Sequence, residues 1–189
     1  MNYTNDELRS LGIGFGNNVS VHSSVEFFNP SRIKLGSDVR IDCFCVISAG
    51  EQVTIGNNVH LASGVSIFGS RGVEIRDFVG LSNRVSIFTA SDDYSTGFLT
   101  NPTIPEQFRN VSGAKVVLDE HVIVGCGSVI MPGVTLARGV AVGALSFVNK
   151  SVPEYFIVSG NPVRKLGVRN SDRLATLERQ FRASKQADL

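Results

Sequence analysis

The sequence is poor in cysteine and carries almost no net charge. Its three cysteines are an odd number, and Cys43 and Cys45 are only two positions apart, which suits neither a disulfide framework nor the usual zinc spacings. A formal net charge of +1 argues against nucleic acid as the main partner, although it leaves room for a local basic pocket that binds phosphates. We therefore expect reduced cysteines and a partner other than nucleic acid.

Long apolar runs are also missing. No stretch of 18 apolar residues occurs, and residues 1–7 lack the charged-then-apolar pattern of a secretory signal. These absences predict a cytoplasmic protein without membrane insertion. A chain of 189 residues with 42% hydrophobic content is long enough to bury one sizeable core, so we expect a single domain.

An internal repeat of 20 residues organises most of the chain. Apolar anchors recur at this spacing in three registers, six residues apart: Phe15, Leu35, Ile55 and Ile75; Val21, Ile41, Leu61 and Leu81; Phe27, Ile47, Ile67 and Ile87. The step of six resumes at Leu118, Val124, Ile130, Leu136, Val142 and Val148. Each hexad has room for one short strand and one turn, and Gly, Asn, Asp and Ser occupy the turn positions. The pattern predicts an all-β solenoid of about six triangular coils over residues 15–150.

Residues 88–117 interrupt this repeat. Asp92, Asp93 and Tyr94 are followed by one glycine and two prolines, so neither helix nor strand is favoured. Structureless loops longer than about 12–15 residues are uncommon inside compact domains and are usually functional. We therefore predict an extruded functional loop over residues 88–117.

Short helices are expected at both ends of the solenoid. Residues 4–10 begin with the possible N-caps Thr4 and Asn5 and have acids in the first turn, so residues 1–14 are predicted to form a capping helix. In the C-terminal segment 151–189, Leu174, Leu177 and Phe181 recur at helical spacing. This segment is expected to end in an amphipathic helix that packs on a neighbour.

The hexads, together with segments 124–136, 143–153 and 159–165, resemble the hexapeptide-repeat acyltransferases. The resemblance runs from the N-terminal helix to about Arg169, and the Gly-Asn-Pro at residues 160–162 is its most specific part. It implies a left-handed parallel β-helix. It also implies a homotrimer in which acetyl-CoA or another acyl-CoA lies in the groove between two prisms, beneath the loop of one of them, without any metal.

The resemblance implies candidate residues for the acyl-CoA. Gly125, Gly127 and Gly143 lie at coil corners, where the missing Cβ would let a thioester approach backbone N–H groups. Each of these glycines also fits a role in the corner turn alone. Three cations near the C-terminal end of the solenoid are expected to bind the CoA phosphates, unless they are simply solvated surface charges: Lys150, Arg164 and Lys165.

The acceptor side departs from relatives that acetylate sugar hydroxyls, because they have a histidine in the loop as general base and this loop has none. The loop pattern resembles instead the N-acyltransferases that act on the amino group of dTDP-4-amino-4,6-dideoxyglucose and depend on acidic residues. A carboxylate with a pKa near 4 is a poor base for a sugar hydroxyl, but an amine needs much less help. An O-acetyltransferase acting on a sugar hydroxyl remains the alternative.

This resemblance suggests roles for individual residues. Asp93 is the predicted main carboxylate, and Glu120 is its predicted partner; a polar turn explains either of them equally simply. The expected acceptor contacts are Asn83, Ser86, Asp92, Tyr94 and His121. His121 would replace the missing loop histidine only if the loop folded back over it. The product is expected to serve surface polysaccharide such as lipopolysaccharide, and the acyl chain length stays open.

Two other functional classes were considered. A carbonic anhydrase of this architecture gathers zinc with two histidines close in sequence and a third one coil away, whereas His22, His60 and His121 are 38 and 61 residues apart. A non-catalytic trimeric scaffold would suit the repeat equally well, and it would not bind CoA.

Overall fold

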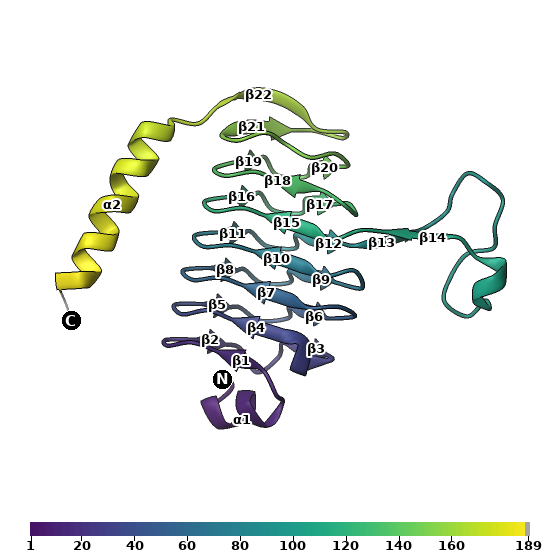
Figure 1. The fold of residues 1–189 in the computed structure, drawn as a ribbon, viewed down its shortest axis with the longest axis horizontal. Coiled ribbons are helices and arrows are strands. Elements are labelled where there is room, and N and C mark those ends of the chain that lie inside the picture. The colour runs from purple at the N-terminus through teal and green to yellow at the C-terminus, as the bar shows by residue number, and fades with distance from the viewer. Residues whose placement is uncertain (188–189) are drawn as a thin grey trace.

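The computed structural model describes residues 1–187, and residues 188–189 of the predicted C-terminal segment lie outside them. The chain forms a triangular prism of stacked β-coils, with one extruded segment on one side and a C-terminal helix on the other (Figure 1). The predicted parallel β-solenoid is therefore confirmed. Among the described residues, no helix combines the length and apolar character that crossing a bilayer requires.

Three sheets form the faces of the prism. Face 1 consists of β1 (Gly14–Phe15), β4 (Ile33–Leu35), β7 (Val53–Ile55), β10 (Val73–Ile75), β15 (Val116–Leu118) and β18 (Thr135–Leu136). Face 2 consists of β2 (Ser20–Val21), β5 (Arg40–Ile41), β8 (His60–Leu61), β11 (Gly80–Leu81), β16 (Ile123–Val124), β19 (Ala141–Val142), β21 (Phe156–Ser159) and β22 (Arg164–Val168). Face 3 consists of β3 (Glu26–Phe28), β6 (Val46–Ser48), β9 (Ser66–Phe68), β12 (Ser86–Phe88), β17 (Val129–Ile130) and β20 (Phe147–Val148).

The coils stack in the register that the repeat predicts. Ile47 pairs with Ile67, and Ile67 pairs with Ile87, so each anchor lies directly over the one before. All pairs between coils are parallel up to β21, which begins a partial seventh turn beyond the six predicted coils, and β22 then returns antiparallel. Phe15 and Phe27 are only half-buried, because they lie in the lowest coil.

Each hexad buries a second residue two positions before the anchor. Val53 and Ile55 on β7 are both buried, while Thr54 between them faces outward. Cys45 occupies such an inner position, where burial raises the pKa of its thiol. The predicted role of Cys45 as a small apolar filler therefore agrees with its position.

The corners between faces 1 and 2 are fastened by a ladder of side chains. The backbone N–H of Asn57 donates to the Asp77 carboxylate at 2.7 Å, and the N–H of Ser37 donates to the Asn57 amide oxygen at 2.8 Å. A Cβ on Gly56 would lie 2.5 Å from the same Asp77 oxygen, so this position must be glycine. The turn glycines therefore make room for the ladder.

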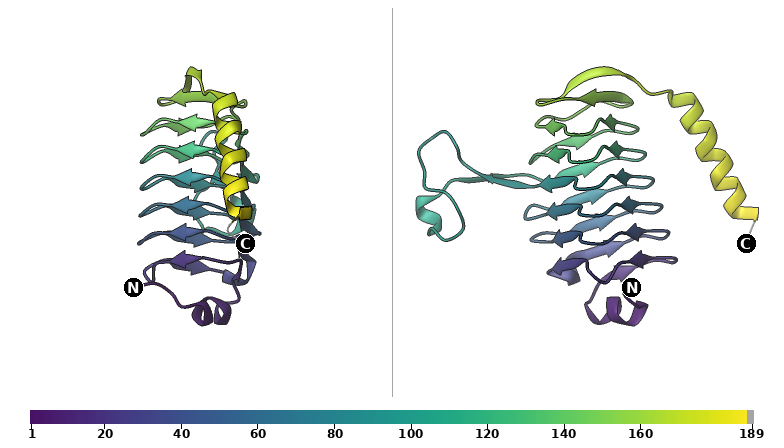
Figure 2. Two further views of the ribbon diagram at one scale, coloured as in Figure 1. Left: turned by 90° about the vertical axis from the view of Figure 1, so that its left-hand side faces the viewer. Right: turned by 180° about the vertical axis from the view of Figure 1, so that it is seen from behind.

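Helices close the two ends of the chain. α1 (Asn5–Ser10) begins at the N-cap Thr4, whose side chain and backbone form a capping box with Glu7, and it buries Leu8 under the first coil. Two short 3₁₀ helices occur, η1 (Pro30–Arg32) and η2 (Glu106–Phe108). α2 (Ser171–Ala187) contains the predicted helical positions Leu174, Leu177 and Phe181 and descends beside the prism (Figure 2). The helix that was expected to pack on a neighbour contacts its own prism, where the Phe181 ring meets the Phe78 ring edge-on at a centroid distance of 5.8 Å.

We expect Ile67→Asp to unfold the prism, because it would bury an unpaired charge between Ile47 and Ile87 at a cost of several kcal/mol. The matched control is Thr54→Asp, which places the same charge on the outer side of β7. Solubility and thermal melting of both variants provide the measurement. Equal melting temperatures for the two variants would contradict the inward register.

Candidate active site

The extruded segment leaves the prism at the corner between faces 3 and 1, after β12. Its base is an antiparallel hairpin of β13 (Ala90–Asp92) and β14 (Val111–Gly113), in which Asp92 pairs with Val111. The sequence prediction that strands are disfavoured throughout residues 88–117 is therefore wrong at the base. Buried Thr89 anchors the hairpin, since its hydroxyl accepts from the Arg71 N–H at 2.9 Å.

Asp93 lies just beyond β13 and is saturated by hydrogen bonds from its own loop. Its carboxylate accepts from the Thr96 hydroxyl and backbone N–H, from the Ser95 N–H at 2.8 Å and from the Asn110 amide at 2.8 Å. These bonds, led by the one from the Thr96 hydroxyl, hold the pKa of Asp93 well below its usual range. The geometry gives Asp93 a part in folding the loop, and its catalytic role stays a prediction.

Asp92 has the opposite environment. Its Oδ2 accepts from the Asn101 N–H at 3.2 Å, while its Oδ1 is buried and has no hydrogen-bond partner among residues 1–187. A buried carboxylate oxygen without a donor is costly, and such groups in folded proteins call for an explanation. One explanation is that a bound molecule supplies the missing donor.

A cavity of about 630 Å³ opens beside Asp92, where the hairpin leaves the prism. It is lined by Phe88, Ala90, Ser91, Asp92, Tyr94, Arg109, Val111, Met131 and Phe147. Phe88 stacks on Phe68 with ring centroids 5.1 Å apart, which holds the aromatic wall in place. The volume lies in the range of small-molecule sites, and the walls are mostly apolar with a few polar groups. Tyr94 is 90% exposed at its edge.

Arg109 was not among the residues predicted from the sequence. It follows η2, and its Nε is buried in this cavity without a partner among the described residues. Only Arg109 and Lys115 are cations within residues 88–117, and this scarcity was the one available signal. Lys115 bonds Glu74 on face 1, so it is already paired.

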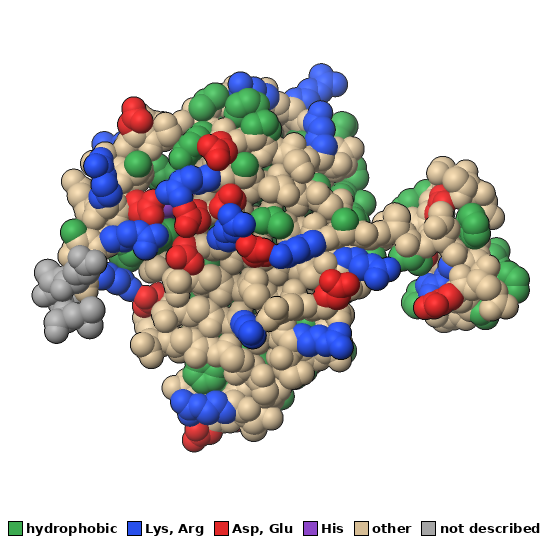
Figure 3. All heavy atoms as spheres, in the orientation of Figure 1, with side chains coloured by type: hydrophobic (Ala, Val, Ile, Leu, Met, Phe, Trp, Pro, Cys, Tyr) green, Lys and Arg blue, Asp and Glu red, His purple; other side chains and the backbone are tan. Residues whose placement is uncertain are grey.

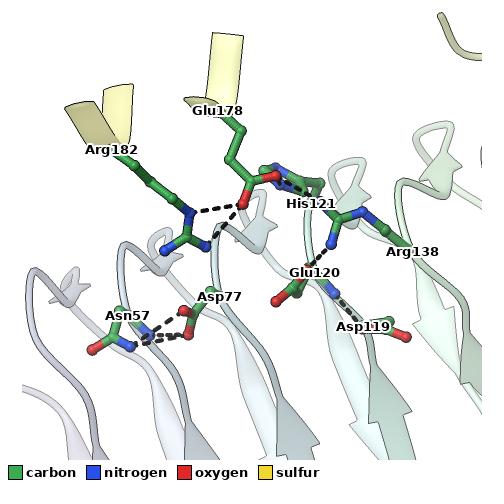
Figure 4. A network of polar contacts seen from close by, with 8 residues as sticks. All are labelled: Asn57, Asp77, Asp119, Glu120, His121, Arg138, Glu178 and Arg182. Carbon is green, nitrogen blue, oxygen red and sulfur yellow. Dashed lines mark hydrogen bonds and ion pairs between the residues drawn. The ribbon is translucent and has the colours of Figure 1, made fainter. Parts of the chain in front are cut away.

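Glu120 and His121 lie at a different corner, between faces 1 and 2. Glu120 forms an ion pair with Arg138, which in turn contacts Glu178 of α2 at 2.6 Å (Figure 4). The loop and α2 lie on opposite sides of the prism (Figure 1). The predicted pair of Asp93 and Glu120 therefore does not meet within one chain.

His121 is also engaged in this second corner. Its ring stacks on Phe78 at a centroid distance of 4.7 Å, and its Nε2 lies 2.8 Å from a carboxylate oxygen of Glu178. Burial opposes the charge on Glu178, but hydrogen bonds from His121 and Arg182 outweigh it and lower the pKa of that carboxyl. Within one chain the loop does not fold over His121, so His121 cannot replace a loop histidine there.

Some of the residues predicted to contact the acceptor or the thioester lie at the third corner, between faces 2 and 3. Asn83 and Gly127 are in contact, because the Gly127 N–H donates to the Asn83 carbonyl at 2.9 Å. Ser86 follows on β12, on the outer side of face 3 beside Phe88. This corner is thus separate from both the loop and Glu120 in a single chain.

The predicted oxyanion role of the three glycines meets an obstacle. The N–H groups of Gly125 and Gly143 donate to carbonyls of the next coil, both at 2.8 Å, and that of Gly127 is taken by Asn83. A Cβ on Gly125 would lie 2.5 Å from the backbone nitrogen of Ala144, so close coil packing requires the glycine. The N–H groups of the three glycines are therefore already engaged, and approach of a thioester to other backbone N–H groups at this corner stays a prediction.

The three predicted phosphate ligands come together at the top of the prism. A cavity of about 500 Å³ is lined by Lys150, Arg164 and Lys165, with Phe156 and Val163 among its apolar walls. Lys165 lies over the Phe156 ring, 3.7 Å from its centroid. The arrangement is a basic pocket of the kind that suits phosphate groups.

Known proteins resemble the chain in sequence, although no family model matches the chain. It is 37% identical over 187 residues to a dTDP-4-amino-4,6-dideoxy-D-glucose acyltransferase of Escherichia coli, covering 97% of each chain. It is 24% identical over 147 residues to a galactoside O-acetyltransferase of Lactococcus lactis, covering 74% of this chain and 67% of that relative.

Solved structures give a consistent picture. The N-acyltransferase AntD from Bacillus cereus, in complex with dTDP and 3-hydroxybutyryl-CoA, superposes with a TM-score of 0.93 at 40% identity and 98% coverage of both chains. Other structures of AntD carry a substituted aspartate or serine, ten positions apart in that chain, with dTDP and coenzyme A bound. The E. coli relative matches this chain over almost the whole length of both, and we conclude that the chain belongs to the family of dTDP-4-amino-4,6-dideoxyglucose acyltransferases.

Proposed function

We propose that this protein transfers an acyl group from an acyl-CoA to the amino group of dTDP-4-amino-4,6-dideoxyglucose. The observation that carries the proposal is the Oδ1 of Asp92, which is buried and has no partner among the described residues, beside the apolar-walled cavity that Asp92 lines at the base of the loop. The names of the relatives support it, since they describe acyltransferases of this sugar nucleotide and complexes with CoA. The histidine-free loop supports an amine acceptor over a hydroxyl.

The reaction requires little from the protein beyond positioning. The uncharged amine attacks the thioester carbonyl carbon, the C–S bond breaks, and the proton lost by nitrogen ends on the departing CoA sulfur. The products are an amide and free CoA. A carboxylate that accepts a hydrogen bond from the amine fixes the direction of attack, which is the role we propose for Asp92.

Two observations favour Asp92 over Asp93 for this role. The Asp93 carboxylate is held by hydrogen bonds from its own loop, whereas the Oδ1 of Asp92, beside the cavity, has no partner among the described residues. The substituted serine and aspartate of AntD are ten positions apart. Ser82 and Asp92 have the same separation here. We therefore assign to Asp92 the part that sequence reasoning gave to its neighbour.

The acyl-CoA is proposed to lie along the upper coils. Its phosphates suit the basic pocket of Lys150, Arg164 and Lys165 at the top of the prism. Its pantetheine arm would then descend past the corner of Gly125 and Gly143. No metal is part of this proposal. The acyl group is acetyl or another short chain, such as the 3-hydroxybutyryl group bound to AntD.

We further propose that the active protein is a homotrimer with its sites between subunits. Ser82 and Asp92 lie at two different corners of one prism, so they meet only if two prisms lie side by side. Exposed apolar side chains on face 3 and its corner with face 2 support this arrangement: Phe28 (56%), Phe44 (70%), Phe68 (41%) and Leu145 (77%). In contrast, face 1 carries paired charges such as Glu74 with Arg76 (Figure 3).

A cytoplasmic location and a role in surface polysaccharide are part of the same proposal. Acyl-CoA donors and nucleotide-linked sugars are made and used in the cytoplasm. Such a modified sugar nucleotide is a precursor for a glycosyltransferase, and a relative in E. coli K12 is named for lipopolysaccharide biosynthesis.

The function is tested by release of free thiol from acetyl-CoA and 3-hydroxybutyryl-CoA. The acceptor panel is dTDP-4-amino-4,6-dideoxyglucose, its 4-hydroxy counterpart and simple glycosides. We expect thiol release only with the amino sugar nucleotide. Turnover of the hydroxyl compounds instead would favour the O-acetyltransferase alternative, and failure to bind CoA would favour a scaffold.

We expect Asp92→Asn to lower kcat by about 10²-fold with little change in CoA affinity, because the substitution keeps the shape but removes the charge that orients the amine. Asp93→Asn should chiefly loosen the loop, raising KM and speeding its cleavage by a protease, because it disturbs the hydrogen bonds to Ser95 and Thr96. Steady-state kinetics with limited proteolysis measures both. The reverse ranking of kcat would restore Asp93 as the catalytic carboxylate.

The protein should run in light scattering with the mass of three chains and bind three CoA molecules per trimer. Phe68→Glu on face 3 should shift it toward the monomer and abolish turnover, since it places a charge on the exposed apolar surface. Thr54→Glu on face 1 is the control and should leave the trimer intact. A wild-type monomer that turns over acyl-CoA would exclude an interfacial site.

A further inference from the structure

Two side chains of opposite sign line the cavity at the base of the loop, and each has a buried polar atom without a partner among the described residues. Asp92 is the last residue of β13, and Arg109 precedes β14 on the returning strand of the same segment. The Oδ1 of Asp92 and the Nε of Arg109 are both buried, and neither has a hydrogen-bond partner in the part of the chain that the structure describes. Both residues line the same 630 Å³ cavity.

These two groups do not neutralise each other. No ion pair within 4.0 Å joins Asp92 to Arg109 in the described chain, although they face one cavity. Charges that fasten this fold are paired, as Arg138 is with Glu120 and Glu178. Burying a donor and an acceptor apart from each other is costly, and a ligand that satisfies both removes the cost.

The missing ligand can be described by its chemistry. Facing Asp92 it needs an N–H donor such as an amine, and facing Arg109 it needs an anion. Guanidinium groups match phosphate oxygens in shape as well as charge, so phosphate is the anion that Arg109 suits best. Between the two ends the walls are apolar, formed by Phe88, Val111, Met131 and Phe147, which suits a deoxysugar or a base.

We propose that Arg109 binds the diphosphate of the acceptor while Asp92 holds its amino group, so that this cavity selects a zwitterionic, nucleotide-linked amino sugar over a free one. The inference rests on the proposed function and adds a specificity-determining residue to it. A free amino sugar would bond Asp92 but leave the Arg109 guanidinium without an anion. It would therefore lack the charge-assisted contact that a diphosphate makes, and it is expected to bind more weakly than the nucleotide-linked sugar.

The test compares wild-type protein with Arg109→Gln and Arg109→Lys. The control is Arg173→Gln, because Arg173 is an exposed arginine on α2 whose side chain also lacks a partner within residues 1–187. Calorimetry on the full-length protein measures the Kd of dTDP and, separately, the Kd of CoA. Thermal melting checks that each variant is folded. If Arg109→Gln does not fold, Arg109→Lys is compared with the wild type instead.

We expect the Kd of dTDP to rise about 10- to 100-fold in Arg109→Gln and less in Arg109→Lys, since lysine keeps the charge but loses the fork. KM for the nucleotide-linked acceptor should rise in parallel while kcat changes little, because the contact is made equally in the bound substrate and in the transition state. The Kd of CoA should stay the same. The Arg173→Gln control should match the wild type throughout.

Three outcomes would overturn the inference. Equal dTDP affinity in Arg109→Gln and the wild type would remove the diphosphate contact but leave the proposed function intact. A rise in the Kd of CoA instead of dTDP would show that Arg109 serves the donor. A wild-type protein that neither binds dTDP nor releases thiol with the nucleotide-linked amine would refute the proposed function, and the inference with it.

Discussion

Every coil of this protein depends on hydrogen bonds to the coil above and below it. Since the strands from β1 to β20 are only two or three residues long, a single coil has no stability of its own, and parallel pairing between coils supplies it. That pairing occupies the backbone donors along the faces, including the N–H groups of Gly125 and Gly143. Chemistry on such a scaffold therefore has to come from side chains at corners and from chain that leaves the stack. The one large departure among the described residues is the extruded segment between β12 and β15, which is shorter at both ends than the predicted loop 88–117 because Phe88 and Val116 pair within the stack.

Much of the scaffold is predictable because it arises from a periodic sequence pattern. The inward anchors recur every 20 residues, so the register of Ile47, Ile67 and Ile87 follows from counting. The helix cap at Thr4 also follows from a local pattern. The hairpin at the base of the loop does not, because β13 and β14 pair outside the hexad register and their partners are about 20 residues apart.

The candidate site is likewise only partly predictable from the sequence. Asp92 and Asp93 are equivalent in the sequence, but adjacent residues at a strand end point to opposite sides, so one meets the cavity and the other meets the loop. The two residues differ only in that Asp92 is the last residue of β13 and Asp93 lies just beyond it. Arg109 was missed for a related reason: its significance lies in the absence of a partner, which a sequence cannot display. In contrast, the grouping of Lys150, Arg164 and Lys165 was predictable because they lie near one end of a linear scaffold, where distance along the chain and distance in space nearly coincide.

The strand arrangement at the two ends of face 2 affects whether further strands can add there. A stack of parallel strands exposes an open edge at its top and bottom, and such edges recruit further strands, as in fibrils. Here β22 folds back antiparallel on β21 at the top, and at the bottom Asn2 forms an antiparallel bridge with His22 while the Tyr3 N–H donates to the Val21 carbonyl at 2.8 Å. A reversed strand interrupts the parallel pattern at each end, and α1 covers the apolar interior below. The parallel edge of face 2 is thereby closed at both ends, which opposes the addition of further copies along the axis at this face.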